Sequence, residues 1–409
     1  MPTIASQEVA IIGAGPAGAW AAYRLAQAGA RVLVFDHSHP REKPCGGGVT
    51  RRALELVSPA LAGRPLDGVR IDGAEFSGPR APSARVRLPG AGPGAPAPLV
   101  VVDRRRFDES LLEAAVEAGA RHVSARVTDV EVGPQGAIVR TRDEAWTVRH
   151  VIGADGANSL VRRRAHHPFR RDQLSIAAGV FAHGLTSRTI LVRFVTAPSG
   201  YIWSFPRGDH LAIGICARAD EATSGQLRAV LDEWLRETGV ADGARLERYG
   251  WPIPSLGPSD LLAQRVAGPS WMLAGDAAGL VDPITREGIY FALQSGDFAA
   301  QALCRDGDPG ACYEDRVRQA IYPELARAAR LQRGFFRSGF TRLLVDALRR
   351  SAAVRDVMAD LMAGEQPYRT LKRRLLATFE IGLAWQLLRL ELGRAMSRSA
   401  AARETHGTT

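Results

Sequence analysis

Apolar and polar residues at the start of the chain follow the pattern of a βαβ unit. Residues 8–13 (EVAIIG) and 30–36 (ARVLVFD) are short apolar runs, which predict two strands. Between them, residues 16–29 (PAGAWAAYRLAQAG) predict a helix. A strand, a helix and a second strand in this order indicate a domain of the α/β class.

Later segments add further helices and strands. Residues 103–120 place apolar side chains on one face of a predicted helix, and residues 224–239 predict another. Six prolines between residues 79 and 98 favour a loop with at most a short strand. From about Ala277 onward the pattern is mostly helical. The strands predicted between these segments cover residues 122–133, 137–142, 145–154, 174–184, 188–195, 201–206 and 210–218.

This order of elements indicates an α/β domain that a β-rich segment interrupts, followed by a helical C-terminal region. A chain of 409 residues has the length of two or three domains, which agrees with this division. The predicted segments are 1–170 (α/β domain, with a loop or short-strand excursion near 70–100), 171–264 (β-rich domain), 265–310 (return to the α/β domain) and 311–409 (helical region).

The composition is that of a soluble globular protein, with 46% hydrophobic and 23% charged residues. We find no secretory leader and no apolar run of about 18 residues, so no membrane-spanning helix is expected. The four cysteines lack the spacing of zinc ligands, and His166-His167 lacks a third ligand, so no metal site is expected. Free thiols favour a cytoplasmic location.

Basic charge is concentrated towards the C-terminus of the chain. The net charge is +10, and Lys43 and Lys372 are the only lysines. From Ile321 to the end there are sixteen Lys/Arg and eight Asp/Glu, a difference of +8. No nucleic-acid motif accompanies this excess, so we expect an anionic membrane surface as partner, on the inner face of the membrane. The amphipathic segment 370–396 would contact it, or alternatively would pack on the protein's own core.

A glycine fingerprint, GAGPAG, joins the first predicted strand to the first predicted helix. Gly13 permits the tight turn, Gly15 lets a pyrophosphate approach the backbone, and Gly18 lets helix and strand pack closely. Pro16 and Ala17 lie between the last two glycines, where free N–H groups of the helix start favour phosphate. The fingerprint therefore predicts a dinucleotide site.

Acidic residues and glycines at later strand ends extend this site. Asp36 ends the second strand, where its carboxylate is suited to accept from ribose hydroxyls. The stretch VIGADGANSLVRR ends another strand, and WMLAGDAAGLVDPITREGIYFA continues from a strand end into a helix start. The candidate cofactor residues in these two stretches are Asp155, Gly156, Gly275, Asp276, Pro283, Gly288 and Ile289.

Together these stretches resemble the FAD-binding motifs of the flavoprotein class typified by para-hydroxybenzoate hydroxylase. Arg104, in VVDRRRFDESL, matches an arginine of the same class, and the resemblance spans roughly residues 8–300. It implies FAD as cofactor. It also implies an α/β fold, with a Rossmann-like FAD-binding domain of the para-hydroxybenzoate hydroxylase type and an inserted β-sheet substrate domain.

Within this class, three elements are similar to the geranylgeranyl reductase family. They are KPCGGG, YIWSFPRGDHLAIGI and GDAAGLVDPITREGIYFA. The resemblance implies that Cys45, Gly46 and Gly47 lie beside the isoalloxazine ring, where glycines allow close approach. It also implies that Tyr201 and Trp203 face the flavin from the substrate sheet.

The family reduces isolated carbon–carbon double bonds in polyprenyl chains, which implies a prenyl lipid or prenylated quinone as substrate. The chemistry implied is hydride transfer from reduced flavin N5, with a proton delivered to the other alkene carbon. Cys45 either assists the proton or only packs against the ring. NAD(P)H or a ferredoxin would supply electrons. The chain departs from the family pattern at Arg207, where lysine is frequent, and at Asp282 and Arg286.

Three other activities of the same fold class stay open at this stage. A halogenase needs an active-site lysine, and only Lys43 lies in the relevant half of the chain. A monooxygenase of the hydroxylase type needs only flavin and a pocket. A redox-neutral cyclase would use bound reduced flavin electrostatically.

Overall fold

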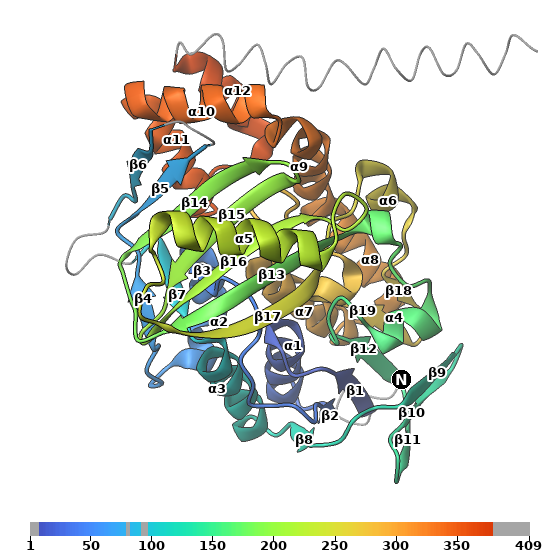
Figure 1. Ribbon diagram of the computed structural model, residues 1–409. Helices are drawn as coiled ribbons and strands as arrows, with labels where there is room; N and C mark the ends of the chain where they lie inside the picture. Colours follow the sequence, from blue (N-terminus) through green and yellow to red (C-terminus); the bar gives the residue numbers. More distant parts are fainter. Residues whose placement is uncertain (1–7, 79–81, 91–96, 379–409) are drawn as a thin grey trace, which may run out of the picture.

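The computed structural model describes residues 8–78, 82–90 and 97–378. Its first sheet has six strands and forms the core of the N-terminal domain (Figure 1). All neighbouring strands are parallel except the edge pair β18–β19. In spatial order the strands are β18 (Ala267–Gly268), β19 (Trp271–Leu273), β12 (His150–Gly153), β1 (Glu8–Ile12), β2 (Arg31–Phe35) and β8 (Arg121–Val123).

The register of this sheet brings three strand ends to one edge. Ile12 of β1 aligns with Phe35 of β2 and with Gly153 of β12. The residues that follow these strands therefore lie together at the carboxyl edge, which is where open α/β sheets bind ligands. Figure 1 shows helices on one face of the sheet, α1 (Pro16–Gln27), α3 (Arg104–Glu117), α7 (Ile289–Leu303) and α8 (Pro309–Ala320).

A small antiparallel sheet packs its apolar residues into the same core. Trp146 makes an edge contact with Phe35, with ring centroids 4.9 Å apart. The predicted strand 145–154 is in fact two strands of different sheets, separated at Arg149. The elements of this side are β9 (Asp129–Gly133), β10 (Gly136–Arg140), β11 (Ala145–Val148) and α4 (Leu160–Ala165).

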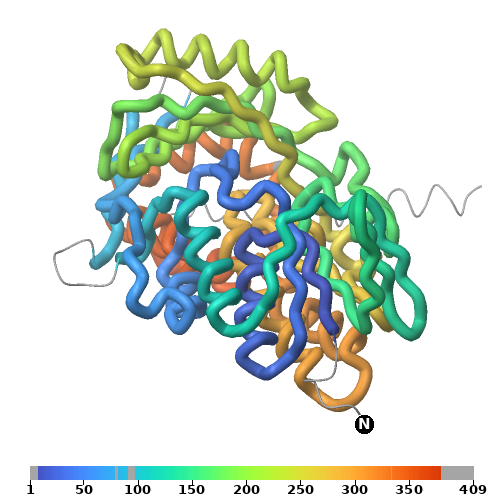
Figure 2. Tube along the Cα trace, turned by 90° about the horizontal axis from the view of Figure 1, so that it is seen from below, coloured from blue at the N-terminus to red at the C-terminus, as the bar shows by residue number. Residues whose placement is uncertain are grey.

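The second large sheet has seven strands. Helix α5 (Ser224–Thr238) covers its outer face, and Figure 2 shows this helix as the outermost layer. Its buried side chains, among them Leu227, Leu231 and Trp234, pack on the apolar residues of the strands. In spatial order these are β17 (Arg245–Pro254), β13 (Leu174–His183), β16 (His210–Arg218), β15 (Ser199–Pro206), β14 (Thr189–Thr196), β5 (Gly73–Ser77) and β6 (Ala84–Arg87).

Strands β5 and β6 come from the segment that was predicted as an excursion of the first domain. They join this seven-stranded sheet, the predicted substrate sheet, because β5 pairs in parallel with β14 and Phe76 packs on Phe194 with ring centroids 6.3 Å apart. Strand β17 was not predicted at all. The four-strand prediction for residues 174–218 agrees with β13 to β16.

The C-terminal helices pack against β5, β6 and β14 rather than standing apart (Figure 1). Leu371 and Leu375 of the last helix are buried in this cluster. The remainder of the amphipathic segment 370–396, from residue 379, lies outside the described residues. The helices are α9 (Tyr322–Phe335), α10 (Ser338–Arg350), α11 (Ala352–Met362) and α12 (Tyr368–Ala377).

Shorter elements connect the two large sheets. They are the strands β3 (Gly48–Thr50), β4 (Gly68–Arg70) and β7 (Leu99–Val102), which form one antiparallel sheet, and the helices α2 (Arg51–Leu61), α6 (Pro258–Ala263), η2 (Arg171–Gln173) and η3 (Gly275–Ala278).

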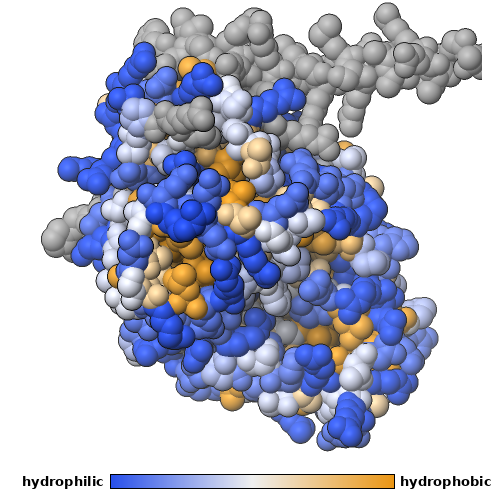
Figure 3. Space-filling view, viewed as in Figure 1, coloured by the Kyte–Doolittle hydropathy of each residue, from blue (hydrophilic) through white to orange (hydrophobic). Residues whose placement is uncertain are grey.

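Among the described residues, no helix has the length and apolar character needed to cross a membrane. The face drawn in Figure 3 is mostly polar, with apolar residues in separate patches.

The crossing of α1 and α7 depends on a glycine. A Cβ at Gly296 of α7 would overlap the carbonyl oxygen of Ala17 in α1. We predict that Gly296→Ala lowers the free energy of unfolding by roughly 1–3 kcal/mol, because the two helices must move apart. Urea denaturation followed by circular dichroism measures the change.

Gly339→Ala is the matched control. Gly339 lies in the first turn of α10, and a Cβ there meets nothing within 4 Å. This control should leave the free energy of unfolding unchanged or raise it slightly, since alanine favours a helix. Equal stability of the two variants would contradict the close-packing explanation.

Candidate active site

The three fingerprint glycines have different surroundings. A Cβ at Gly13 would overlap Ala154, and one at Gly18 would overlap the carbonyl oxygen of Gly13. A Cβ at Gly15 would meet nothing within 4 Å. Gly13 and Gly18 are thus required by the protein's own packing, whereas Gly15 faces open space at the carboxyl edge of the sheet.

The start of α1 offers a phosphate site at this open space. Gly15 is the residue before the helix, and no side chain caps the helix start. The first backbone N–H groups of a helix lack intrahelical partners and carry partial positive charge. This arrangement fits a pyrophosphate, and Pro16 and Ala17 lie in the turn that would contact it.

Asp36 directly follows β2 at the same edge. Its carboxylate accepts from the backbone N–H of Ala14 at 3.0 Å, and from the backbone N–H and the hydroxyl of Ser38 at 2.9 and 2.6 Å. Burial alone would raise the pKa of Asp36, but hydrogen bonds from His39, Ser38 and Ala14 hold it well below its usual range. The carboxylate therefore stays ionised as a hydrogen-bond acceptor.

Asp155 accepts hydrogen bonds from the backbone at the start of α4. One of its oxygens accepts from the backbone N–H groups of Leu160 and Val161 at 2.6 and 3.3 Å, at the start of α4. Gly156 follows with a φ of +79°, which favours glycine. Burial raises the pKa of Asp155.

The loop from η3 to α7 crosses the same edge. Asp276 accepts from Lys43 at 2.9 Å, and Gly275 has a φ of +58°. Pro283 is buried in the loop, and Gly288 precedes Ile289 at the start of α7 without a side-chain cap. The free helix start at Gly288 is therefore a second place where partial positive charge faces the site.

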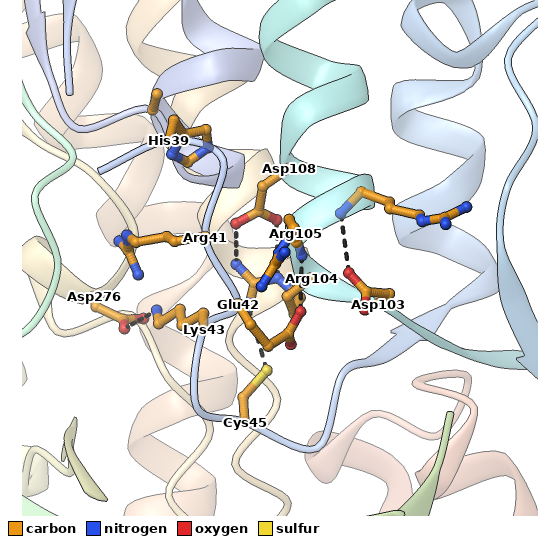
Figure 4. A network of polar contacts seen from close by, with 12 residues as sticks. His39, Arg41, Glu42, Lys43, Cys45, Asp103, Arg104, Arg105, Asp108 and Asp276 are labelled. Atoms are coloured by element: carbon orange, nitrogen blue, oxygen red, sulfur yellow. Dashed lines mark hydrogen bonds and ion pairs between the residues drawn. The ribbon is translucent and has the colours of Figure 1, made fainter. Parts of the chain in front are cut away.

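Two buried arginines hold the loop that contains Cys45. Arg104 makes a double hydrogen bond to Asp108, at 2.9 and 2.6 Å, and a third to the Cys45 sulfur at 3.3 Å. Arg207 donates to the Cys45 carbonyl oxygen at 2.8 Å and forms an ion pair with Glu42. Figure 4 shows Cys45 below Arg104, with Lys43 turned towards Asp276.

Two glycines of this loop, Gly46 and Gly47, are packed against other parts of the protein. A Cβ at Gly46 would lie 3.0 Å from the Phe205 ring. Gly47 has a φ of +81°, and a Cβ there would lie 2.6 Å from the carbonyl oxygen of Val102. The loop is therefore glycine-rich because of the protein's own neighbours, whatever else approaches it.

A cavity of about 270 Å³ lies between the two large sheets. Its first part is bounded by the sheet edge, the Cys45 loop and the start of α7. Its second part is apolar, lined by the inner face of the substrate sheet and by α9 and α11. The apolar lining includes Phe76, Ile190, Val192, Phe194, Trp203, Phe205, Ile253, Phe335, Phe336, Met358 and Leu361.

Several predicted site residues meet in this cavity. Those that line it are Pro16, Cys45, Gly46, Gly47, Arg104, Tyr201, Trp203, Asp276, Gly288 and Ile289. The rings of Tyr201 and Trp203 lie 5.8 Å apart. The other predicted residues do not line it, namely Gly13, Gly15, Ala17, Gly18, Asp36, Asp155, Gly156, Gly275 and Pro283.

Sequence reasoning missed other parts of the wall. Trp251 and Ile253 line it from β17, and Phe335, Phe336, Met358 and Leu361 line it from the helical region. A smaller apolar cavity of about 30 Å³ continues between α9, α10, α11 and α12. The aromatic and proline-rich WPIP stretch was the one available signal for β17.

Comparison with known proteins identifies the family. The FAD binding domain family matches residues 6–305. Menaquinone reductase of Mycolicibacterium smegmatis is 32% identical over 73% of this chain and 77% of its own length. Geranylgeranyl diphosphate reductase of Rhodobacter capsulatus is 30% identical over 71% of this chain and 73% of its own length.

The chain belongs to the geranylgeranyl reductase family of FAD-binding flavoproteins. A geranylgeranyl bacteriochlorophyll reductase-like protein from Thermoplasma acidophilum has the same fold. Its structure has a TM-score of 0.74 and 24% identity, and the match covers 91% of this chain and 99% of that one.

The residues present fit FAD. The open space at Gly15 and the uncapped start of α1 suit the pyrophosphate, and Asp36 is an ionised acceptor at the strand end. The cavity beside Cys45 and Gly288 suits the isoalloxazine ring. The para-hydroxybenzoate hydroxylase-type fold implied by the sequence is thus confirmed.

We predict that Gly15→Val abolishes retention of FAD without unfolding the protein. The new side chain would occupy the space suited to the pyrophosphate, and its Cβ meets no protein atom within 4 Å. The flavin-to-protein absorbance ratio after purification measures the first effect, and the melting temperature of the apoprotein measures the second.

Gly18→Val is the comparison variant. Its Cβ would overlap Gly13, so it should lower the melting temperature of the apoprotein as well as flavin content. If Gly15→Val retained FAD at the normal ratio, the assignment of the pyrophosphate to this turn would be wrong.

Proposed function

We propose that this flavoprotein reduces isolated carbon–carbon double bonds in the prenyl chain of a lipid or of a prenylated quinone. The observation that carries the proposal is one cavity that joins the Cys45 loop to an apolar chamber. The names of the relatives, menaquinone reductase and geranylgeranyl diphosphate reductase, support the same substrate class.

The apolar chamber suits a hydrocarbon chain. Aromatic and aliphatic side chains from β14, β15, α9 and α11 line it, and burying apolar surface contributes roughly 25 cal/mol per Å². Such walls exclude water and limit the positions of a flexible chain. An isolated alkene is a poor electrophile, so close positioning and exclusion of water are what the protein must supply.

Reduced FAD would supply the hydride when bound, and the protein would have to provide the proton. Tyr201 lines the cavity, and its hydroxyl lies 3.4 Å from the carbonyl oxygen of Thr285. Burial raises the pKa of Tyr201 well above its ordinary value, so the hydroxyl keeps its proton but is a weaker acid than a free tyrosine. Tyr201 is our candidate for the proton donor because it lies in the wall of the cavity, and Cys45 lines the same cavity.

The contacts of Lys43 argue against a halogenase. Lys43 is the one lysine in the cavity lining among the described residues, and Asp276 holds its ammonium group at 2.9 Å. Hydroxylase and cyclase activities use no special side chain, so assay products distinguish them. For the electron donor we propose NAD(P)H or a ferredoxin.

We further propose that the protein takes its substrate from the surface of an anionic membrane. Arg369 and Arg373 are exposed residues of α12, and Leu376 of the same helix is 52% exposed. Basic residues with a nearby exposed apolar side chain favour the interface of an anionic bilayer. The helices around the apolar chamber would then lie next to the lipid.

The reaction itself gives the main prediction. Anaerobic enzyme with photoreduced flavin should saturate a geranylgeranyl-chain substrate, and each flavin oxidised should add two hydrogens to one chain. Mass spectrometry of the extracted chain measures the product, because a quinone ring alone would also oxidise flavin.

Tyr201→Phe is the informative variant for this assay. It should retain FAD yet slow saturation by about a hundredfold, the usual size of a lost general acid. An oxygenated product in air would favour a hydroxylase, and isomerisation without flavin oxidation would favour a cyclase. Either result would contradict the proposed reduction.

Membrane binding is tested by vesicle flotation. The full-length protein should float with vesicles of anionic lipid at low salt and should be released by high salt. The double variant Arg369→Glu/Arg373→Glu should lower binding at least tenfold, since each basic residue contributes about 1 kcal/mol. The control variant Arg142→Glu/Arg149→Glu, on the other side of the molecule, should bind vesicles normally. An equal loss of vesicle binding in the two double variants would contradict a specific membrane-binding surface at α12.

A further inference from the structure

Arg286 has an unusual backbone conformation. Its φ is +61°, and it is the one residue other than glycine with a positive φ among the described residues. Glycine would adopt this conformation without strain, whereas a side chain disfavours it. The chain keeps an arginine here despite that cost, which indicates that the side chain itself is needed.

Arg286 lines the cavity, and its guanidinium lies near the Cys216 thiol and forms no ion pair with any acidic side chain among the described residues. One nitrogen donates to the Ser255 hydroxyl at 2.9 Å, and Gln332 donates to the same hydroxyl at 3.1 Å. The buried Nε of Arg286 has no hydrogen-bond partner within the described part of the chain.

Every other charged side chain of the wall is paired. Lys43 contacts Asp276, Arg104 contacts Asp108, and Glu287 forms an ion pair with Arg52. Arg286 is therefore the one lining cation for which the described residues show no ion pair.

One further donor belongs to the same cavity wall. The indole N–H of Trp251 is buried and makes no hydrogen bond to any described residue, whereas the indole N–H of Trp203 lies against the Tyr249 hydroxyl. An indole N–H and a guanidinium only donate, so neither can satisfy the other. Buried donors left unpaired are costly, and a ligand that brings acceptor oxygens would satisfy them.

We propose that Arg286 binds a carbonyl oxygen on the polar head of the substrate, and that this head is a neutral ring of the quinone type. The proposal rests on the proposed function. A diphosphate head carries several negative charges, and one unpaired guanidinium in an apolar chamber would leave most of them uncompensated. A carbonyl oxygen needs only donors, which this wall provides.

Ligand binding to the oxidised holoenzyme tests this assignment. Three ligands with the same geranylgeranyl chain are compared by their perturbation of flavin absorbance: a naphthoquinone, a diphosphate and the hydrocarbon without a head. Arg286→Gly should weaken binding of the quinone roughly 10- to 100-fold, the usual size of a lost hydrogen bond to a charged group. Binding of the hydrocarbon should not change.

Two more variants separate binding from folding. Arg286→Gly should melt at the same temperature as the wild type or higher, because glycine relieves the strained φ. Arg286→Lys should recover part of the quinone affinity, since it keeps a cationic donor. Arg142→Gly, an exposed arginine away from the cavity, should leave all three affinities unchanged.

Several results would overturn the assignment. Unchanged quinone affinity, equal weakening of the hydrocarbon, a larger loss for the diphosphate, or a lower melting temperature of Arg286→Gly would each do so. If the wild type binds and saturates the chain while Arg286→Gly binds the quinone equally well, only this inference fails. If the wild type binds none of the three ligands, the proposed function fails with it.

Discussion

The active-site architecture depends on two buried guanidinium groups that hold one loop. Arg104 comes from α3 of the FAD-binding domain, and Arg207 follows β15 of the substrate sheet, yet both reach Cys45. Arg207 is fully buried, and this burial lowers its pKa to about 10, so its ion pair with Glu42 offsets a large desolvation cost. Glu42 also accepts from the backbone N–H of Arg105 at 3.0 Å, which connects the substrate sheet to the start of α3.

Because that loop is held from both sides, the cavity wall that it forms has a fixed position. This first wall is polar and belongs to the FAD-binding domain, and the second wall is apolar and belongs to the substrate sheet. The third wall comes from α9 and α11, so helices of the C-terminal region line the cavity.

Glycine is found at positions around the site for two different physical reasons. Gly13, Gly18, Gly46 and Gly47 are required by neighbouring protein atoms, whereas Gly15 faces open space that suits a ligand. Arg286 is the opposite case, because a position that favours glycine carries a long charged side chain. Local strain of this kind persists only where the surrounding structure holds it, which is typical of functional sites.

The sequence by itself determined FAD as the cofactor and the class of the fold. The fingerprint, Asp36 and the later strand ends are short local patterns, in which spacing along the chain dictates geometry. The tertiary structure alone decided that β5 joins a strand more than a hundred residues away, that Trp251 and α11 line the cavity, and that Gly46 faces Phe205. Pairing and packing between distant segments depend on the shape of the whole core, and no local pattern of residues encodes that shape.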